Sequence, residues 1–279
     1  MTKKRLAQVM AIVNRTPDSF YDQGSTFEVE AALRRCDDVV AQGASIVDIG
    51  GVKAGPGGKV SAAEEIDRVI PTIEAVHQRH PHVLISVDTW RSKVAEAAIR
   101  AGAGLVNDTW AGWDPELLEV AGSFGAGYVC SHTGGITPRT RPHRVHFDDV
   151  VADVIAETTQ LAEKAVAAGC PPELTFVDPT HDFGKNTFHG LELLRRIDEI
   201  VATGWPVLMA LSNKDFVGET LDRPVGERVA GTLAATAWSA ARGVAVFRVH
   251  EVKETIDTLC MTAAIAGEIP PLATTRGLA

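Results

Sequence analysis

The sequence has few of the features that mark secreted, membrane-spanning or zinc-knuckle proteins. Its four cysteines, Cys36, Cys130, Cys170 and Cys260, are far apart and form no C-x-x-C pair, which argues against a disulfide framework or a zinc knuckle. No apolar run approaches the length of a membrane span, and the run before Asn14 is short even for a signal-peptide core. These absences predict a cytoplasmic protein with no membrane partner.

Basic residues are also fewer than acidic residues. The 279 residues include 27 lysines and arginines and 36 acidic residues, so the net charge is −9. Acids and bases are mixed along the chain, whereas nucleic-acid-binding surfaces are usually rich in clustered lysine and arginine. We therefore expect no nucleic-acid partner.

Short runs rich in valine, isoleucine and leucine recur along the chain, and a polar turn and a segment of helical period follow each of them. Such continuous apolar runs are typical of strands buried on both faces of a parallel sheet. The runs cover residues 8–14, 45–51, 83–89, 105–109, 128–132, 174–179, 206–212 and 244–250. Eight β–α units in this length predict a (β/α)8 TIM barrel, with a doubly wound open sheet as the alternative. No linker or composition break divides the chain, so we expect residues 1–279 to form a single domain.

Polar side chains stand at the carboxyl ends of nearly all these runs, and in a parallel barrel those ends form the face that carries the active site. One aspartate after a strand is usually a helix cap or a turn residue, and this explanation stays open for Asp48 and Asp108. A whole series is more informative, because acids and amides suit a hydrogen-bonding heterocycle and cations suit phosphate or pyrophosphate. The series comprises Asn14, Asp88, Asn107, His132, Asp178, Ser212, Lys214, Arg248 and His250. It predicts a small-molecule pocket.

Motifs along almost the whole chain resemble the dihydropteroate synthase family in order and spacing. NRTPDSFYDQG (14–24) is similar to the first-strand signature of that family, N-V-T-P-D-S-F-S-D-G-G. The similarity continues through IVDIGG (46–51), SVDTW (86–90), VNDTWAG (106–112), DP…FGK (178–185), LSNK.FVG (211–218) and FRVHEV (247–252). The resemblance implies a barrel that condenses 6-hydroxymethyl-7,8-dihydropterin pyrophosphate with p-aminobenzoate, usually with Mg²⁺, as a step towards folate. It also implies a homodimer.

The resemblance assigns the pterin end of the expected site. Asp88, Asn107 and Asp178 correspond to the residues that hold the pterin ring nitrogens and amino group. Lys214 corresponds to the lysine that lies between the two substrates, and Ser212 belongs to the same expected substrate site.

The resemblance also assigns the pyrophosphate and Mg²⁺ end to Asn14, Arg248 and His250, with Asn14 as the expected metal ligand. Charge builds on the leaving group as its bond breaks, so fixed cations and a metal aimed there lower the barrier. Asp18 and Ser19 correspond to a first loop that closes over the metal and the second substrate. The expected catalytic residues are Asp88, Asp178, Lys214 and Arg248.

The loop after the second strand departs from the family pattern. The family has G-G-E-S-T-R-P-G there, whereas residues 50–57 are GGVKAGPG, so that Gly55 stands in place of the arginine. The Thr-Arg-Pro part of the family loop helps to enclose p-aminobenzoate. Lys53 and Arg15 are the cations available to replace it.

Two further departures lie on the same side of the expected pocket. D-P-G-x-G-F-G-K becomes DPTHDFGK, so Thr180, His181 and Asp182 replace two glycines and an aliphatic residue. S-R-K becomes SNK, so Asn213 replaces a second arginine near the p-aminobenzoate site. We expect a divergent family member that keeps the pterin and pyrophosphate site and has weak or absent condensation with p-aminobenzoate. The alternatives are a fully active synthase and a non-catalytic ligand-binding barrel. His143 and His146 lie in the arginine-rich segment 137–146, which we expect to be a solvated loop, with a metal site as the alternative.

Overall fold

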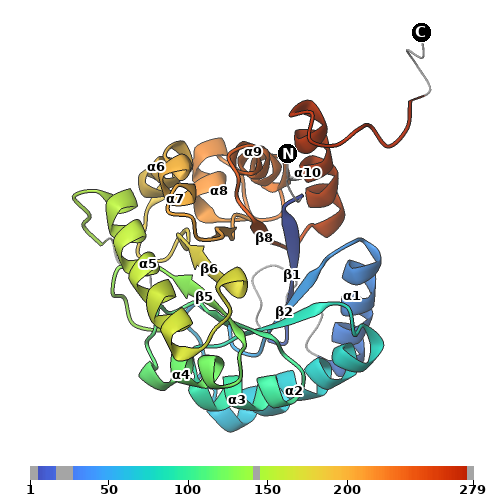
Figure 1. Ribbon diagram of the computed structural model, residues 1–279, viewed down its shortest axis with the longest axis vertical. Coiled ribbons are helices and arrows are strands. Elements are labelled where there is room, and N and C mark those ends of the chain that lie inside the picture. The colour runs from blue at the N-terminus through green and yellow to red at the C-terminus, as the bar shows by residue number, and fades with distance from the viewer. Residues whose placement is uncertain (1–5, 17–27, 141–144, 275–279) are drawn as a thin grey trace.

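The computed structural model describes residues 6–16, 28–140 and 145–274, and its eight parallel strands form a nearly closed barrel (Figure 1). The strands are β1 (Gln8–Asn14), β2 (Ile46–Gly50), β3 (Leu84–Asp88), β4 (Leu105–Asp108), β5 (Gly127–Ser131), β6 (Thr175–Asp178), β7 (Leu208–Met209) and β8 (Val246–Val249). Their order in the sheet is β6-β5-β4-β3-β2-β1-β8-β7, and a bridge between Val177 and Val207 joins the two ends. The predicted TIM barrel is confirmed, and the open-sheet alternative is wrong.

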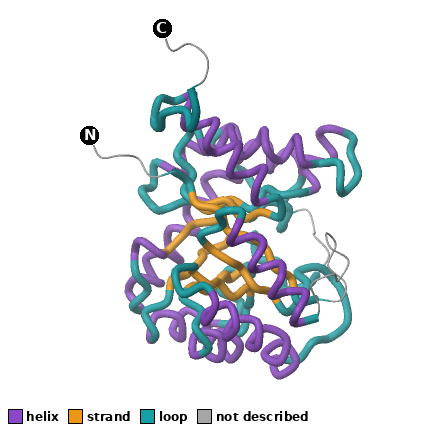
Figure 2. Tube along the Cα trace, turned by 90° about the vertical axis from the view of Figure 1, so that its right-hand side faces the viewer, coloured by secondary structure: helices purple, strands orange, loops and turns teal. Residues whose placement is uncertain are grey.

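Helices surround the barrel, so the strands lie in the middle of the molecule (Figure 2). They are α1 (Val29–Ala41), α2 (Ala62–Arg79), α3 (Ser92–Arg100), α4 (Pro115–Ser123), α5 (Val150–Ala168), α6 (Thr187–Arg195), α7 (Ile197–Val201), α8 (Asp215–Leu221), α9 (Val229–Ala240) and α10 (Val252–Ile265), with a short 3-10 helix at Pro172–Leu174. None of the described helices combines the length and the apolar composition that a membrane crossing requires.

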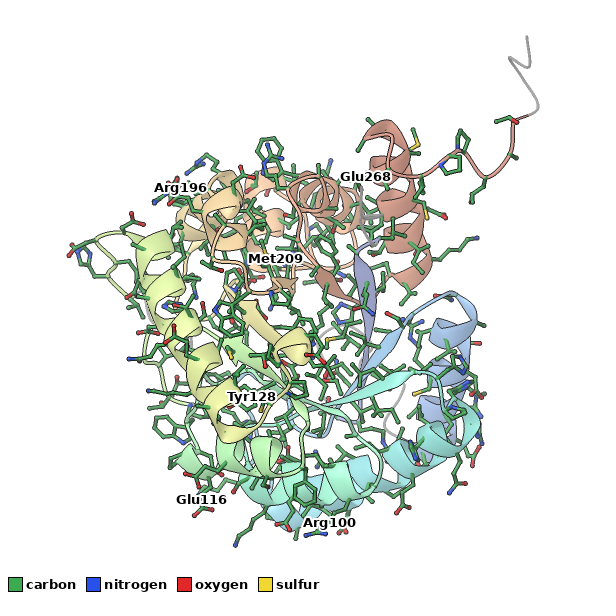
Figure 3. All side chains as sticks on the ribbon, in the orientation of Figure 1. Arg100, Glu116, Tyr128, Arg196, Met209 and Glu268 are labelled. Atoms are coloured by element: carbon green, nitrogen blue, oxygen red, sulfur yellow. The ribbon has the colours of Figure 1, made fainter. Side chains whose placement is uncertain are left out.

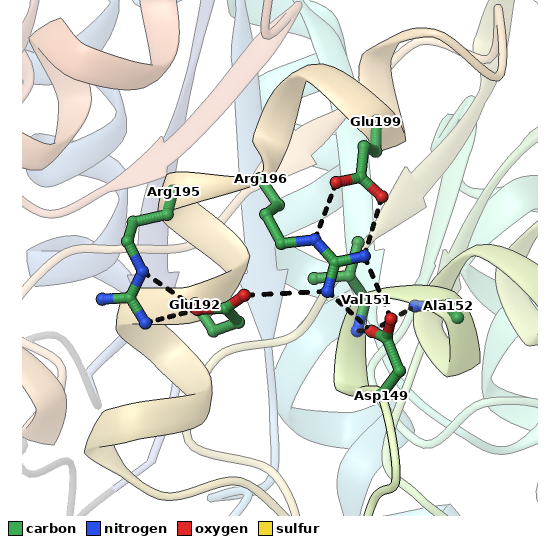
Figure 4. Close-up of polar contacts among 7 residues, drawn as sticks. All are labelled: Asp149, Val151, Ala152, Glu192, Arg195, Arg196 and Glu199. Carbon is green, nitrogen blue, oxygen red and sulfur yellow. Dashed lines mark hydrogen bonds and ion pairs between the residues drawn. The ribbon is translucent and has the colours of Figure 1, made fainter.

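Local sequence accounts for several helix ends. Ser61 accepts a hydrogen bond from the Glu64 amide as the N-cap of α2, and Gly169 ends α5 in the left-handed conformation, with φ 115°. The N-cap of α5, Asp149, also binds Arg196 at the α6–α7 junction, with oxygen–nitrogen distances of 2.9 and 3.0 Å (Figure 4). The carboxylate that caps α5, by accepting from the Val151 and Ala152 amides, therefore also ties this helix to the next two.

The apolar core explains why the pocket lies at one end of the barrel. Side chains alternate along each strand, so inward-facing residues recur at every second position. On β6, Phe176 fills the barrel interior and Asp178 lines the pocket above it; on β8, Val246 and Arg248 do the same. On β7, Leu208 belongs to this interior layer, whereas Met209, labelled in Figure 3, packs in the core between the strands and the helices. The apolar layer consists of Met10, Ile46, Leu105, Val129, Phe176, Leu208 and Val246.

Candidate active site

A cavity of about 240 Å³ opens at the carboxyl ends of the strands. All the residues expected in the substrate site line it, although they come from six strands or the loops that follow them. They are Asn14, Asp88, Asn107, Asp178, Ser212, Lys214, Arg248 and His250. The parallel register places Asp88 opposite Asn107, which explains how residues distant in the sequence share one wall.

Arg248 is the centre of an ion-pair network at the base of this pocket. Its Nε donates to Asp48 Oδ2 at 2.6 Å, and its Nη2 donates to Asp88 Oδ2 at 2.7 Å. Asn107 Nδ2 also donates to Asp48 Oδ2, at 3.0 Å, and Thr109 Oγ1 donates to Asp88 Oδ1, at 2.8 Å. Asp48 is fully buried and positions both Arg248 and Asn107, so it is more than the turn residue that the sequence left open.

Burial changes the acid–base properties of this network. It raises the pKa of Asp88 to about 6, although Arg248 acts in the opposite direction. Burial alone lowers the pKa of Arg248, but the Asp48 and Asp88 carboxylates raise it above the usual value. Burial also raises the pKa of Asp178 to about 6, against the Thr180 amide, which donates to its Oδ1 at 2.7 Å, and against Lys214. The pocket thus holds two carboxyls that titrate just below neutral pH.

His250 and Ser212 also line the cavity and contact each other. His250 Nδ1 lies 2.9 Å from Ser212 Oγ, which donates to Glu251 Oε2 at 2.8 Å. Burial, together with Arg248, Lys214 and Arg35, lowers the pKa of His250 to about 3, so its imidazole is neutral near pH 7. Three cations therefore lie near His250, and the Glu251 carboxylate lies beside Ser212.

A family described as pterin-binding enzyme matches residues 10–250, which is most of the chain. The chain belongs to the pterin-binding enzyme family. It is 60% identical over 275 residues to the protein named inactive dihydropteroate synthase 2 of Mycobacterium leprae (strain TN), covering 97% of this chain and 94% of that protein.

Solved structures of dihydropteroate synthases share the fold. The Yersinia pestis enzyme with a sulfonamide drug complex has a TM-score of 0.88 at 35% identity, over 94% of both chains. The Xanthomonas albilineans enzyme with 4-aminobenzoic acid has a TM-score of 0.85 at 37% identity, over 95% of this chain and 94% of that one.

The turn after β6 is one of the places where this member of the pterin-binding family departs from the expected pattern. Thr180 and Asp182 have φ values of 52° and 70°, in the left-handed region that favours the glycines of the family motif. Lys185 holds the turn, because its Nζ donates to the carbonyls of His132, Thr180 and Phe183 at 2.8, 3.3 and 3.1 Å. Burial lowers the pKa of Lys185 to about 7.

His181 lies in the pocket wall and is fully buried. Its ring packs against Phe216 at a centroid distance of 5.2 Å, and neither ring nitrogen has a hydrogen-bond partner among the described residues. Burial, followed by Lys185 and Lys214, lowers its pKa to about 3. An uncharged imidazole therefore stands where the family has an aliphatic side chain. Asp182 is turned away, and its carboxylate accepts from the Asp215 amide at 2.6 Å.

We call the loop between β2 and α2, residues 51–60, the lid. Three arginines hold it over the pocket: one from α2, one at the start of α3 and one from the loop after β5. Val52, Lys53, Ala54 and Gly55 line the cavity. The donated hydrogen bonds run from Arg68 to the Gly51 carbonyl at 2.8 Å, from Arg91 to the Val60 carbonyl at 2.8 Å, and from Arg139 to the Gly55 and Gly58 carbonyls at 3.4 and 2.6 Å. Arg139 belongs to the segment 137–146, so part of this expected loop contacts the lid.

Three other expectations need correction. The Asn213 side chain does not line the pocket, because its Nδ2 donates to Glu251 Oε1 at 2.7 Å. Arg15 is buried against α2, where its Nη1 donates to Thr72 Oγ1 at 2.9 Å, so Lys53 is the candidate cation at the lid. His132 follows β5, but its ring faces α5, with Nε2 3.2 Å from Asp153 Oδ2. Asp18 and Ser19 lie outside the described residues.

Asp108 is a turn residue and not part of the pocket, which is the simpler explanation that its sequence position left open. Its carboxylate accepts from the Trp110 and Gly112 amides at 3.0 and 2.6 Å and from the Tyr128 hydroxyl at 2.6 Å. It therefore shapes the turn after β4 and does not line the cavity.

Proposed function

We propose that this chain binds a pterin pyrophosphate and condenses it with p-aminobenzoate weakly or not at all. The pterin lies against Asp88, Asn107, Asp178 and Lys214, which share one wall of the cavity. Carboxylates suit the ring N–H and amino donors of a pterin, and Asn107 can both donate and accept. Both carboxylates can also stabilise positive charge that develops on the pterin when the pyrophosphate leaves.

The pyrophosphate lies toward Asn14, Ser212 and His250. Arg248 and Lys214 supply positive charge there, and the neutral His250 ring adds a hydrogen-bonding group without opposing an anion. Among the described residues that line this end, Asn14 offers an amide oxygen near the Asp88 carboxylate: both lie close to Gly50, at 3.6 and 3.7 Å from the position a Cβ would take. A site that offers only a few protein oxygens beside a phosphate is suited to Mg²⁺, because this ion usually completes its coordination shell with phosphate and water. Bound there, Mg²⁺ would neutralise charge on the leaving group.

The defect lies at the lid. Gly55 replaces the arginine expected to enclose p-aminobenzoate, and it lines the cavity without any side chain to offer. The 60% identity to a protein named inactive, against 35–37% to solved synthases, supports the same proposal. A carboxylate-bearing substrate loses a few kcal/mol of binding when a desolvated arginine contact is lost.

Two measurements test the proposal. Calorimetry should show that the pterin pyrophosphate binds with Mg²⁺, and steady-state assays should show turnover with p-aminobenzoate far below about 1 per second. Turnover at ordinary enzyme rates would favour the fully active alternative, and failure to bind any pterin would favour a barrel with another ligand. A lid rebuilt as Val52→Glu, Lys53→Ser, Ala54→Thr and Gly55→Arg should gain turnover without a change in pterin affinity.

We propose that residues 1–279 form one pterin-binding domain and that the protein works in the cytoplasm as a homodimer. The exposed apolar residues Met261 and Ile265 on α10 support the homodimer.

A further inference from the structure

A second group of metal-binding side chains lies outside the pocket, between the end of β5 and α5. The ring of His132 is fully buried and faces two carboxylates of α5, those of Asp153 and Glu157. His132 Nε2 lies 3.2 Å from Asp153 Oδ2 and 3.4 Å from Glu157 Oε2, and the three ligand atoms all lie within 4.8 Å of one another. The two acids are four residues apart, so they share one face of the helix.

Hydrogen bonding alone does not account for this arrangement. A neutral imidazole carries at most one proton on Nε2, so it cannot donate a good hydrogen bond to both carboxylates. The Asp153 separation of 3.2 Å is a long hydrogen bond, and the Glu157 separation of 3.4 Å exceeds the usual N–H···O range of about 2.7–3.2 Å. Two ligands bound to a tetrahedral ion at about 2.0–2.1 Å are about 3.3–3.4 Å apart, which is close to the two separations from His132 Nε2.

The local charges suit a cation. Burial and Lys185 lower the pKa of His132 to about 3, so the ring is in the uncharged form that ligates metals. Two carboxylates then face a neutral ring. Lys185 opposes a cation, but its ammonium is turned toward three backbone carbonyls, including that of His132, rather than toward the carboxylates.

We propose that His132, Asp153 and Glu157 bind a divalent cation such as Zn²⁺ or Mn²⁺, with a further coordination position left for water. One imidazole and two carboxylates form a ligand set suited to these ions. The Asp153 and Glu157 side chains are 41% and 51% exposed, so an ion can reach the site from solvent. None of the three residues lines the active-site cavity, which separates this site from any Mg²⁺ near Asn14.

The site is connected to the pocket through the backbone of His132. Its N–H donates to Thr180 Oγ1 at 3.0 Å and its carbonyl accepts from Lys185 at 2.8 Å. A bound ion would therefore fix the strand end that supports the turn after β6.

The test uses the full chain freed of metal with a chelator and titrated with Zn²⁺ or Mn²⁺ in the absence of pyrophosphate. Calorimetry should give one ion per chain at this site, and the melting temperature should rise with ion concentration. Glu157→Gln and Asp153→Asn, which alter exposed side chains, should each weaken binding at least tenfold. Glu163→Gln, an exposed acid on the same helix, is the matched control and should leave affinity unchanged. Unchanged affinity in Glu157→Gln, or no binding to the unmodified chain at millimolar ion, would overturn the proposal.

Discussion

At the scale of single residues, the buried carboxyls of the pocket make ligand binding depend on pH. The pKa of Asp178 and that of Asp88 are both raised to about 6, so below pH 6 both groups lose the charge that accepts pterin donors. We predict that affinity for a dihydropterin changes little above pH 7 and falls below pH 6 by up to about tenfold per pH unit for each carboxyl that must be charged, or about a hundredfold when both are required. Titration calorimetry across this range measures it.

Asp178→Asn is the control for this prediction. It should weaken binding by roughly 1.5–3 kcal/mol at pH 7.5, the usual range for a hydrogen bond to a charged group, and reduce the dependence on pH. Affinity that is equal at pH 7.5 and pH 5 would show that neither carboxyl is needed in its charged form.

The contribution of His181 to the free energy of unfolding can also be measured with one substitution. Its buried ring nitrogens lack partners among the described residues, and a buried polar group without a partner costs free energy. We predict that His181→Leu raises the free energy of unfolding of the unliganded protein by about 1 kcal/mol. The ring has a pKa of about 3, below the ordinary 6.5, so the unfolded chain binds more protons between these values. The gain should therefore increase as pH falls below 6.5.

Urea unfolding measures this gain, with His189→Leu as the comparison. His189 completes a capping box with Asn186, so its replacement should lower stability. A loss of stability in His181→Leu would mean that the ring already has a stabilising role in the unliganded protein.

At the scale of elements, the lid depends on a loop that is distant in the sequence. Arg139 donates to two lid carbonyls from 81 and 84 residues away. We predict that Arg139→Ala increases the rate of amide hydrogen exchange in residues 51–60 and leaves the exchange of the barrel strands unchanged. Arg100→Ala, which removes an exposed arginine paired with Glu96 on the same helix, should have no effect on the lid. Equal exchange in the two variants would show that Arg139 does not hold the lid.

Such long-range contacts cannot be predicted from local sequence. The strands were predictable because inward positions and apolar runs follow local rules, and Asp178 and Arg248 were predictable because they end those strands. Asp48 and Arg139 were not identified, because the function of each depends on a partner far along the chain: Arg248 lies 200 residues after Asp48. The predicted position of the Asn213 side chain, near the p-aminobenzoate site, was likewise wrong. Its φ of 59° and its hydrogen bond to Glu251 are set by tertiary packing.

At the scale of the whole molecule, α10 presents an apolar surface that the described part of the chain does not cover. Met261 is 62% exposed and Ile265 is 76% exposed, and a spacing of four residues places them on one face of the helix. Large apolar side chains gathered on a surface commonly mark a protein interface, and a closed symmetric dimer would bury the same face of both copies. We predict that Met261→Glu combined with Ile265→Glu converts a dimer to a monomer. The substitutions would place negatively charged carboxylates of the two copies against one another in the interface. Phe188→Glu, at an equally exposed residue on α6, should leave the dimer intact. Sedimentation equilibrium distinguishes the outcomes, and an unmodified chain that sediments as a monomer at micromolar concentration would contradict the prediction.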